Sequence, residues 1–350
     1  MSVRLTDEQR EFADLAHEVL AKVSSADTLL RERDGVAGRD RWAQLGKVGL
    51  LSATVPEAHG GLGLSPRGLV LVAEEVGYFA LPEPLIETAC IAAPLLARHA
   101  PTEVAGEWLP RIAEGRALVT IQASGPSSTA PFGQEADLVI VIEGSGVALC
   151  PQGSGTTVSL RESADVLRRL ARVKPGPKAI RFGDSRVAAE VTADATAWAA
   201  VMLNGISKRL LDMSVDYAKM REQFGRPIGT FQSIKHMLAD VATEVETVRA
   251  AAWYAVMLDD QDLENRVVAS SVAKWSASRA AAVANRNALQ VHGGIGFTRE
   301  NPLSLWLVRG KKFEAQWGTQ HFHARILGER LMQAEDVVEA FGPTLAKQAP

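Results

Sequence analysis

Apolar residues recur at intervals of three and four over long stretches of the chain, which is the period of an amphipathic α-helix. The two clearest stripes follow Trp198; they are Ala199, Met202, Leu203, Ile206, Leu210, Met213, Tyr217 and Met220, and then Ile234, Leu238, Val241, Val245, Val248 and Ala252. The segment RPIGTFQ at 226–232 lies between them and is short enough to fold one helix back on the other. The C-terminal part is therefore predicted to be an antiparallel helical bundle.

The pattern changes twice, which divides the chain into three zones. Residues 1–116 are predicted to be helical, beginning with a capping box in which Gln9 follows Thr6 by three residues. Residues 117–191 contain short β-branched runs between Gly, Pro and Ser clusters, which favour a small antiparallel sheet. Within this zone, VLRRLARV at 166–173 fits one helical turn or two. Residues 192–350 form the bundle, so the fold class is mainly α with a small β domain.

Composition narrows the functional classes. At 350 residues and 47% hydrophobic content, the chain can bury a core for two or three layers. Its 38 basic and 41 acidic side chains form no block of like charge, which disfavours nucleic acid and anionic membranes as partners. Cys90 and Cys150 are too few for a disulfide framework or a metal cluster. The charged N-terminus and the lack of an 18-residue apolar run favour a soluble, cytoplasmic protein.

The first candidate site is the turn between the two bundle helices. It gathers one arginine, two amides and two aromatic rings, which are Arg221, Gln223, Gln232, Phe224 and Phe231. An arginine fork can hold a phosphate and a phenyl ring can stack on a purine. In the alternative interpretation, Arg221 and Gln232 only cap the helix ends and Phe224 packs on the hairpin.

The second candidate site is QVHGGIGFTRENP at 290–302, where two glycines follow a helix. Gly293 fits a left-handed C-terminal cap, and the bare backbone of Gly293 and Gly294 would let a ligand approach closely. We interpret His292 as a hydrogen-bonded packing residue, because no second ligand lies at a metal-like spacing. No metal site is predicted.

Four segments in their order along the chain resemble the acyl-CoA dehydrogenase family. They are LTDEQREF at 5–12, VPEAHGGLGLS at 55–65, the run YAKMREQFGRPIGTFQSIKHMLADV at 217–241, and QVHGGIGFTRENPL at 290–303. The resemblance covers nearly the whole chain and implies an FAD enzyme that removes hydrogens from the α and β carbons of an acyl-CoA thioester. In this family a carboxylate takes the α proton, the flavin accepts the β hydride, and the electrons leave to an electron-transferring flavoprotein.

The resemblance also implies a set of cofactor contacts. The residues that match the adenosine and pyrophosphate half of FAD are Arg221, Gln223, Phe224, Phe231, Gln232, Gln290, Gly293 and Gly294, and a turn beside the cofactor is matched by Gly318 and Thr319. In the family's tetramers that FAD belongs largely to the neighbouring subunit. This half of the cofactor site is complete.

Three departures from the family pattern concern the other half. The stretch at 119–133 lacks the Glu-Pro-containing turn that holds the flavin ring, and a later Trp-Ile-Thr type segment is not visible. The catalytic glutamate of the family falls on Trp317, whose indole cannot accept a proton. No catalytic base is therefore predicted at the usual position.

Two acidic residues are candidates for a displaced base. Asp194 is the nearest acid to the region near Ala195 where some relatives carry the glutamate, although an Asp before an apolar run is typical of a helix N-cap. Glu314 precedes Trp317 by nearly one helical turn, so it reaches the same place only if the helix changes register.

Three hypotheses for function follow. In the first, the chain is the subunit without a base in an α2β2 acyl-CoA dehydrogenase, completing the FAD site of a homologous partner that carries the base; steroid side-chain CoA thioesters are then the expected substrates. In the second, it is a self-sufficient homotetramer that uses Asp194 or Glu314. In the third, it is a non-catalytic scaffold of the same fold.

Overall fold

The N-terminal region is helical, as predicted. The computed structural model describes residues 5–33, 39–125, 128–258 and 262–335; residues 1–4, which belong to the charged N-terminus noted above, lie outside them. The elements of this region are α1 (Asp7–Val23), α2 (Ala26–Glu32), α3 (Arg39–Lys47), η1 (Glu57–His59), η2 (Pro66–Leu69), α4 (Val70–Tyr78), the π-helical η3 (Glu87–Ala92), α5 (Ala93–His99) and α6 (Thr102–Ala113). The capping box is present, since Gln9 N donates to Thr6 Oγ1 at 3.2 Å and Thr6 N donates to Gln9 Oε1 at 3.1 Å.

The middle region contains a mixed sheet rather than the antiparallel one expected. Its strands are β1 (Val119–Gln122), β2 (Leu138–Glu143), β3 (Gly146–Pro151), β4 (Thr157–Leu160), β5 (Ala171–Lys174) and β6 (Ile180–Phe182). The main sheet has the order β1-β2-β3-β6, and β1 pairs with β2 in parallel. The long connection at 123–137 returns the chain to the starting edge, which a hairpin turn cannot do. The run at 166–173, expected to form one or two helical turns, forms only the short 3-10 turn η4 (Val166–Arg168); its last residues instead begin β5, which pairs with β4 as a separate ribbon.

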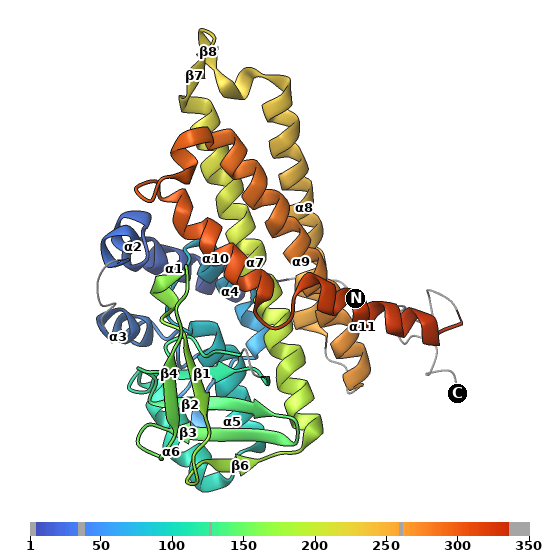
Figure 1. Cartoon of the computed structure of the whole chain (residues 1–350). Helices are drawn as coiled ribbons and strands as arrows, with labels where there is room; N and C mark the ends of the chain where they lie inside the picture. Colours follow the sequence, from blue (N-terminus) through green and yellow to red (C-terminus); the bar gives the residue numbers. More distant parts are fainter. Residues whose placement is uncertain (1–4, 34–38, 126–127, 259–261, 336–350) are drawn as a thin grey trace.

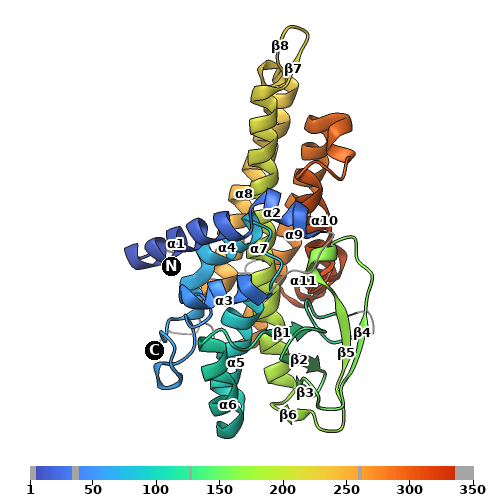
Figure 2. The same cartoon turned by 90° about the vertical axis from the view of Figure 1, so that its left-hand side faces the viewer.

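The C-terminal region is built on one very long helix. Its elements are α7 (Ser185–Met220), the two-residue strands β7 (Glu222–Gln223) and β8 (Arg226–Pro227), η5 (Ile228–Thr230), α8 (Gln232–Met257), α9 (Leu263–His292), η6 (Gly293–Phe297), α10 (Leu303–Ala315) and α11 (Gln320–Gln333). In Figures 1 and 2, α7, α8 and α9 lie side by side and the β7–β8 hairpin is at the end away from the sheet. Within the described ranges, no helix is long and apolar enough to cross a membrane.

The start of α7 corrects one prediction. Asp184, not Asp194, is the N-cap, because its carboxylate accepts a hydrogen bond from Val187 N at 3.0 Å. Asp194 therefore lies inside the helix, and α7 begins before the boundary expected at 192. The first three turns are helical because Val187, Ala188 and Val191 bury one face.

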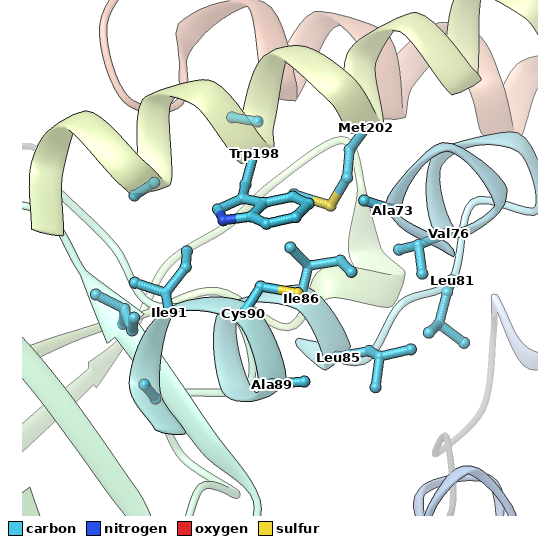
Figure 3. Close-up of a cluster of buried hydrophobic side chains, with 14 of the residues drawn as sticks. Ala73, Val76, Leu81, Leu85, Ile86, Ala89, Cys90, Ile91, Trp198 and Met202 are labelled. Carbon is cyan, nitrogen blue, oxygen red and sulfur yellow. The ribbon is translucent and has the colours of Figure 1, made fainter. Parts of the chain in front are cut away.

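The N-terminal region packs directly on α7. Two glycines let the backbones of α4 and α7 touch: a Cβ on Gly77 would lie 2.0 Å from Met202 O, and one on Gly205 would lie 2.1 Å from Glu74 O. Next to this crossing, the indole of Trp198 and the thioether of Met202 cover apolar side chains in and just before η3, including Cys90 and Ile86 (Figure 3). The three regions consequently share one hydrophobic core.

Candidate functional site

The two motifs predicted to contact a cofactor meet in one hollow. It has a volume of about 710 Å³ and lies where the α7–α8 turn faces the end of α9. Seven of the ten predicted cofactor-side residues line it, namely Arg221, Gln223, Phe224, Phe231, Gln290, Gly293 and Gly294. Segments that are about 70 residues apart in the sequence thus form a single site, which the sequence motifs alone could not show.

Aromatic and amide groups dominate this hollow. Tyr217 and His292 stack with their ring centroids 4.4 Å apart, and Phe224 meets Phe231 edge to face at 6.0 Å. The guanidinium of Arg226 lies 4.3 Å from the Phe231 ring centroid. Because phenyl rings offer flat apolar faces beside the Arg221 guanidinium, the lining suits a ligand with a planar ring and an anionic group.

His292 is a packing residue in this site, as predicted. It is 6% exposed, and its Nδ1 donates to Ala288 O at 2.8 Å. Burial lowers the pKa of the imidazole, so the ring is neutral and its Nε2 is an acceptor at physiological pH. No group of three or more potential metal ligands occurs among the described residues, and His292 has no metal-like surroundings.

Two residues that line the hollow have unusual backbone dihedral angles. Phe224 has a φ of 53° and is 91% exposed, so the turn holds an aromatic ring out in solvent. Gly293 has a φ of 59° but a ψ of −142°, which is not the left-handed helical cap that we predicted. This extended conformation is accessible to glycine alone and turns the chain from α9 directly into η6.

The remaining predicted contacts are not in this hollow. Gln232 begins α8, and its Nε2 lies 2.9 Å from His236 Nε2. Gly318 and Thr319 form the turn between α10 and α11, and Gly318 O accepts a hydrogen bond from Lys274 Nζ at 2.9 Å. Lys274 precedes His292 by 18 residues on α9, a rise of about 27 Å along that helix. The predicted contacts therefore form two separate sites.

The turn at 315–319 is held by two residues that the sequence motifs did not identify. Lys274 is fully buried, and its ammonium group also donates to Glu314 O and Ser278 Oγ, both at 3.1 Å. Burial lowers the pKa of Lys274 to about 7. The only signal in the sequence is its place among the buried small residues of α9.

His323 holds the same turn from α11. Its Nε2 donates to Trp317 O at 2.9 Å, and its Nδ1 lies 3.2 Å from Ser271 Oγ, which donates to it. Burial lowers the pKa of His323 to about 4, which is consistent with this neutral tautomer. Trp317 adopts a φ of 60° and Gly318 a φ of 103°. The backbone around the position of the missing glutamate is thus fixed from α9 and α11.

None of the three residues considered for catalysis is placed as a base. Trp317 is 8% exposed and packs in the hydrophobic core. Asp194 forms an ion pair with Arg266 at the wall of a different hollow, about 680 Å³ in volume, between α5 and α7. Glu314 accepts a hydrogen bond from Lys311 Nζ at 3.0 Å. Both carboxylates are therefore neutralised by neighbouring cations.

The stretch predicted to lack flavin-ring contacts uses its polar groups internally. The amide of Gln122 is buried and bonds both backbone groups of Val173, accepting from N at 2.8 Å and donating to O at 2.9 Å. Beside it, the buried Arg168 pairs with Glu87 at 2.6 Å and lies 5.1 Å from the Phe313 ring centroid. Protein side chains thus fill the junction between the sheet, η3 and α10.

Comparisons with known proteins agree with this architecture. Residues 6–116 match the acyl-CoA dehydrogenase N-terminal domain, and residues 186–332 match the acyl-CoA dehydrogenase C-terminal domain. The acyl-CoA dehydrogenase IpdE2 of Mycolicibacterium smegmatis is 32% identical over 75% of this chain and 78% of its own length. The ChsE4-ChsE5 complex from Mycobacterium tuberculosis contains a chain with a TM-score of 0.85 and 23% identity, which covers 95% of this chain and 100% of its own. A chain of the Tcur3481-Tcur3483 steroid ACAD has a TM-score of 0.83 and 24% identity, covering 93% and 98%.

The two halves of the structure can be compared with what the family requires. FAD is the cofactor of acyl-CoA dehydrogenases, and the hollow at the α7–α8 turn supplies an arginine, two amides and aromatic faces that fit its adenosine and phosphate part. The junction between the sheet, η3 and α10, by contrast, is filled by protein side chains such as Arg168 and Glu87. The sequence similarity, the two matched domains and the shared fold together show that this chain belongs to the acyl-CoA dehydrogenase family of oxidoreductases.

Proposed function

We propose that this chain is the base-deficient subunit of a hetero-oligomeric acyl-CoA dehydrogenase and completes the FAD site of a homologous partner subunit. The observation that carries the proposal is the asymmetry between the two halves of the cofactor site. The adenosine-side residues converge on one open hollow, while the catalytic position is a buried tryptophan. The partner would supply the flavin-ring contacts, the base and the acyl pocket.

Two exposed aromatic residues support an interface at this place: Phe224 lines the hollow, and Phe297 ends η6, whose first residues line it. Phe224 is 91% exposed and Phe297 is 74% exposed, although both are large apolar side chains. Exposed aromatic side chains beside a hollow are typical of protein interfaces rather than of free surface. A partner that covers the hollow would bury these rings together with the adenosine part of its own cofactor.

The substrate class is inferred by analogy with relatives. One structural neighbour is named as a steroid ACAD, and another is a complex of two different chains, ChsE4 and ChsE5. By this analogy the assembled enzyme would oxidise CoA thioesters of steroid side chains and pass electrons to an electron-transferring flavoprotein. The alternative of a displaced base is disfavoured, because Asp194 and Glu314 are already paired with Arg266 and Lys311.

Replacement of Arg221 tests the proposal. We expect the wild-type chain to be colourless alone and to form a yellow, active complex after co-expression with a longer acyl-CoA dehydrogenase homologue encoded beside it. Arg221→Ala removes a charged donor to the cofactor's phosphates, so the complex should bind FAD about 10- to 100-fold more weakly. FAD affinity is measured by flavin absorbance after dialysis and reconstitution.

Lys219→Ala is the matched control, because Lys219 is an exposed cation near the end of the same helix that pairs with Asp216 and lies outside the hollow. It should leave FAD affinity unchanged. Wild-type FAD affinity in the Arg221→Ala complex, or a yellow and active homo-oligomer of this chain alone, would refute the proposed role. Trp317→Glu alone should give no dehydrogenase activity, because the sequence motifs that hold the flavin ring in the family are also absent.

A further inference from the structure

A second basic cluster lies in the sheet region, far from the cofactor hollow. Three basic side chains from different segments line a hollow of about 330 Å³: Arg161 just after β4, Arg172 in β5 and Lys312 in α10. The hydroxyl groups of Ser128 and Thr129 also face it, and Glu162 contributes an acidic group. With all these groups ionised, the lining carries a net charge of +2, from three cations and one carboxylate.

Strand register explains why the two arginines share a face. Ser159 pairs with Arg172 across the β4–β5 ribbon, and the antiparallel pattern continues one step further, since Arg161 N donates to Leu170 O at 2.8 Å. Side chains two residues apart on a strand point the same way, so Arg161 follows Ser159 onto the face that carries Arg172. The two guanidinium groups are diagonal neighbours, with Cα atoms about 7–8 Å apart.

The protein compensates only part of the charge on this face, through Glu162 in the lining and through the attraction of Asp165 for Lys312. Within the ranges that the structure describes, no ion pair or side-chain hydrogen bond joins Arg161, Arg172 or Lys312 to another residue. Other arginines of the sheet region are paired, such as Arg169 with Glu135 at 3.2 Å and Arg181 with Glu143 at 3.1 Å. Repulsion between like charges on one face is unfavourable, and a bound anion would relieve it.

Lys312 adds to the positive potential from the opposite wall. Its side chain is half-buried, and its pKa is lowered by burial and by repulsion from the Arg168 guanidinium. Asp165 opposes this shift by attracting Lys312, but its carboxylate is already paired with Arg309. A partly desolvated cation attracts an anion more strongly than one in open water does.

We propose that this hollow is a binding site for a phosphate group, held by Arg161, Arg172 and Lys312. The planar guanidinium forks match the oxygens of a phosphate, and the ammonium group supplies a point charge. Thr129 also lines the hollow, whereas the Ser128 hydroxyl donates to Ser124 O at 2.6 Å. The phosphate is either the free anion or the terminal group of a phosphate ester. This site is independent of the proposed role of Arg221, because no residue lines both hollows.

Phosphate binding to the full chain tests the proposal directly. Titration calorimetry and thermal melting are carried out with inorganic phosphate, with glycerol phosphate as an ester that carries no adenosine for the cofactor hollow, and with potassium chloride at matched ionic strength. Arg172→Gln and Lys312→Gln should each raise the dissociation constant at least tenfold. Lys174→Gln is the matched control: Lys174 lies two residues from Arg172 on the same ribbon face, is exposed, and is outside the hollow. It should bind phosphate with wild-type affinity.

The two anions distinguish the source of the phosphate. Binding of inorganic phosphate at least as tight as that of glycerol phosphate assigns the site to the free anion, and tighter binding of glycerol phosphate assigns it to an ester. An equal thermal shift with potassium chloride, or wild-type affinity in both Arg172→Gln and Lys312→Gln, would overturn the proposal. The variants change different segments, β5 and α10, so misfolding of one leaves the other as the test.

Discussion

Lys274→Met should change how the stability of this protein depends on pH. Lys274 donates to three acceptors, Glu314 O, Gly318 O and Ser278 Oγ, and through them it fixes the turn that contains Trp317. Methionine has similar length and fits an apolar site, but it cannot donate a hydrogen bond. The substitution therefore removes the titration of one buried group while keeping most of its packing.

The magnitude follows from the pKa of Lys274, which burial lowers from 10.5 to about 7. Between these two pH values the unfolded lysine binds a proton that the folded lysine has released. The unfolded state binds more protons, so the free energy of unfolding rises with pH over this interval. The slope is about 1.4 kcal/mol per pH unit, and the whole interval amounts to about 5 kcal/mol. Below pH 7 both states are protonated and this contribution is flat.

Urea denaturation of both proteins at pH 6.5, 7.5, 8.5 and 9.5 measures this effect, at values chosen to span the interval of about 7 to 10.5. The wild type should gain about 1.4 kcal/mol per pH unit relative to Lys274→Met above about pH 7.5. Lys219→Met, at an exposed position, should run parallel to the wild type. If the wild type and Lys274→Met also ran parallel, the buried ammonium would not be titrating near neutrality and our account of the turn would be wrong.

Two further predictions concern the core. Gly205→Ala places a methyl group 2.1 Å from Glu74 O and should lower the unfolding free energy by at least about 3 kcal/mol. Gly106→Ala on α6 is the control, because a Cβ there meets nothing within 4 Å, and it should raise the unfolding free energy by up to about 1 kcal/mol. Urea titration separates the two, and equal effects would contradict the close crossing of α4 and α7. Arg168→Met leaves Glu87 buried without its partner and should cost about 3–5 kcal/mol, while the double variant Arg168→Met with Glu87→Gln should recover part of that loss; no recovery would mean that the pair is not coupled.

A sequence signal that acts within one helical turn predicted the start of α1 correctly. The spacing of Thr6 and Gln9 specifies a capping box because both hydrogen bonds form within one turn. The start of α7 was predicted wrongly, since both Asp184 and Asp194 precede helical patterns and the choice depends on which apolar face finds a partner. The parallel pairing of β1 with β2 was missed for a related reason, because strand direction is decided by the path of a 15-residue connection.

Only those residues of the candidate site that belong to a family motif could be predicted from the sequence. Arg221 and Gly293 carry family motifs, but their meeting in one hollow is a long-range contact that no local pattern specifies. Lys274 and His323 had no motif, because a lysine in a helix is ordinarily solvent-exposed and its burial depends on carbonyl groups about 40 residues away. Residues whose role is to hold a turn are found from hydrogen bonds, not from spacing.

The position of Arg221 depends on the orientation of the long helix α7. α7 crosses α4 at Gly205, and Arg221 lies 16 residues beyond this crossing, about 24 Å along the helix axis. A tilt of α7 by only about 5° around this crossing would therefore displace Arg221 by about 2 Å, which is more than a hydrogen bond to a phosphate tolerates. Substitutions in the N-terminal region can for this reason weaken cofactor binding at the α7–α8 turn without contacting the cofactor. A genetic screen for flavin loss would therefore recover substitutions far from the cofactor hollow.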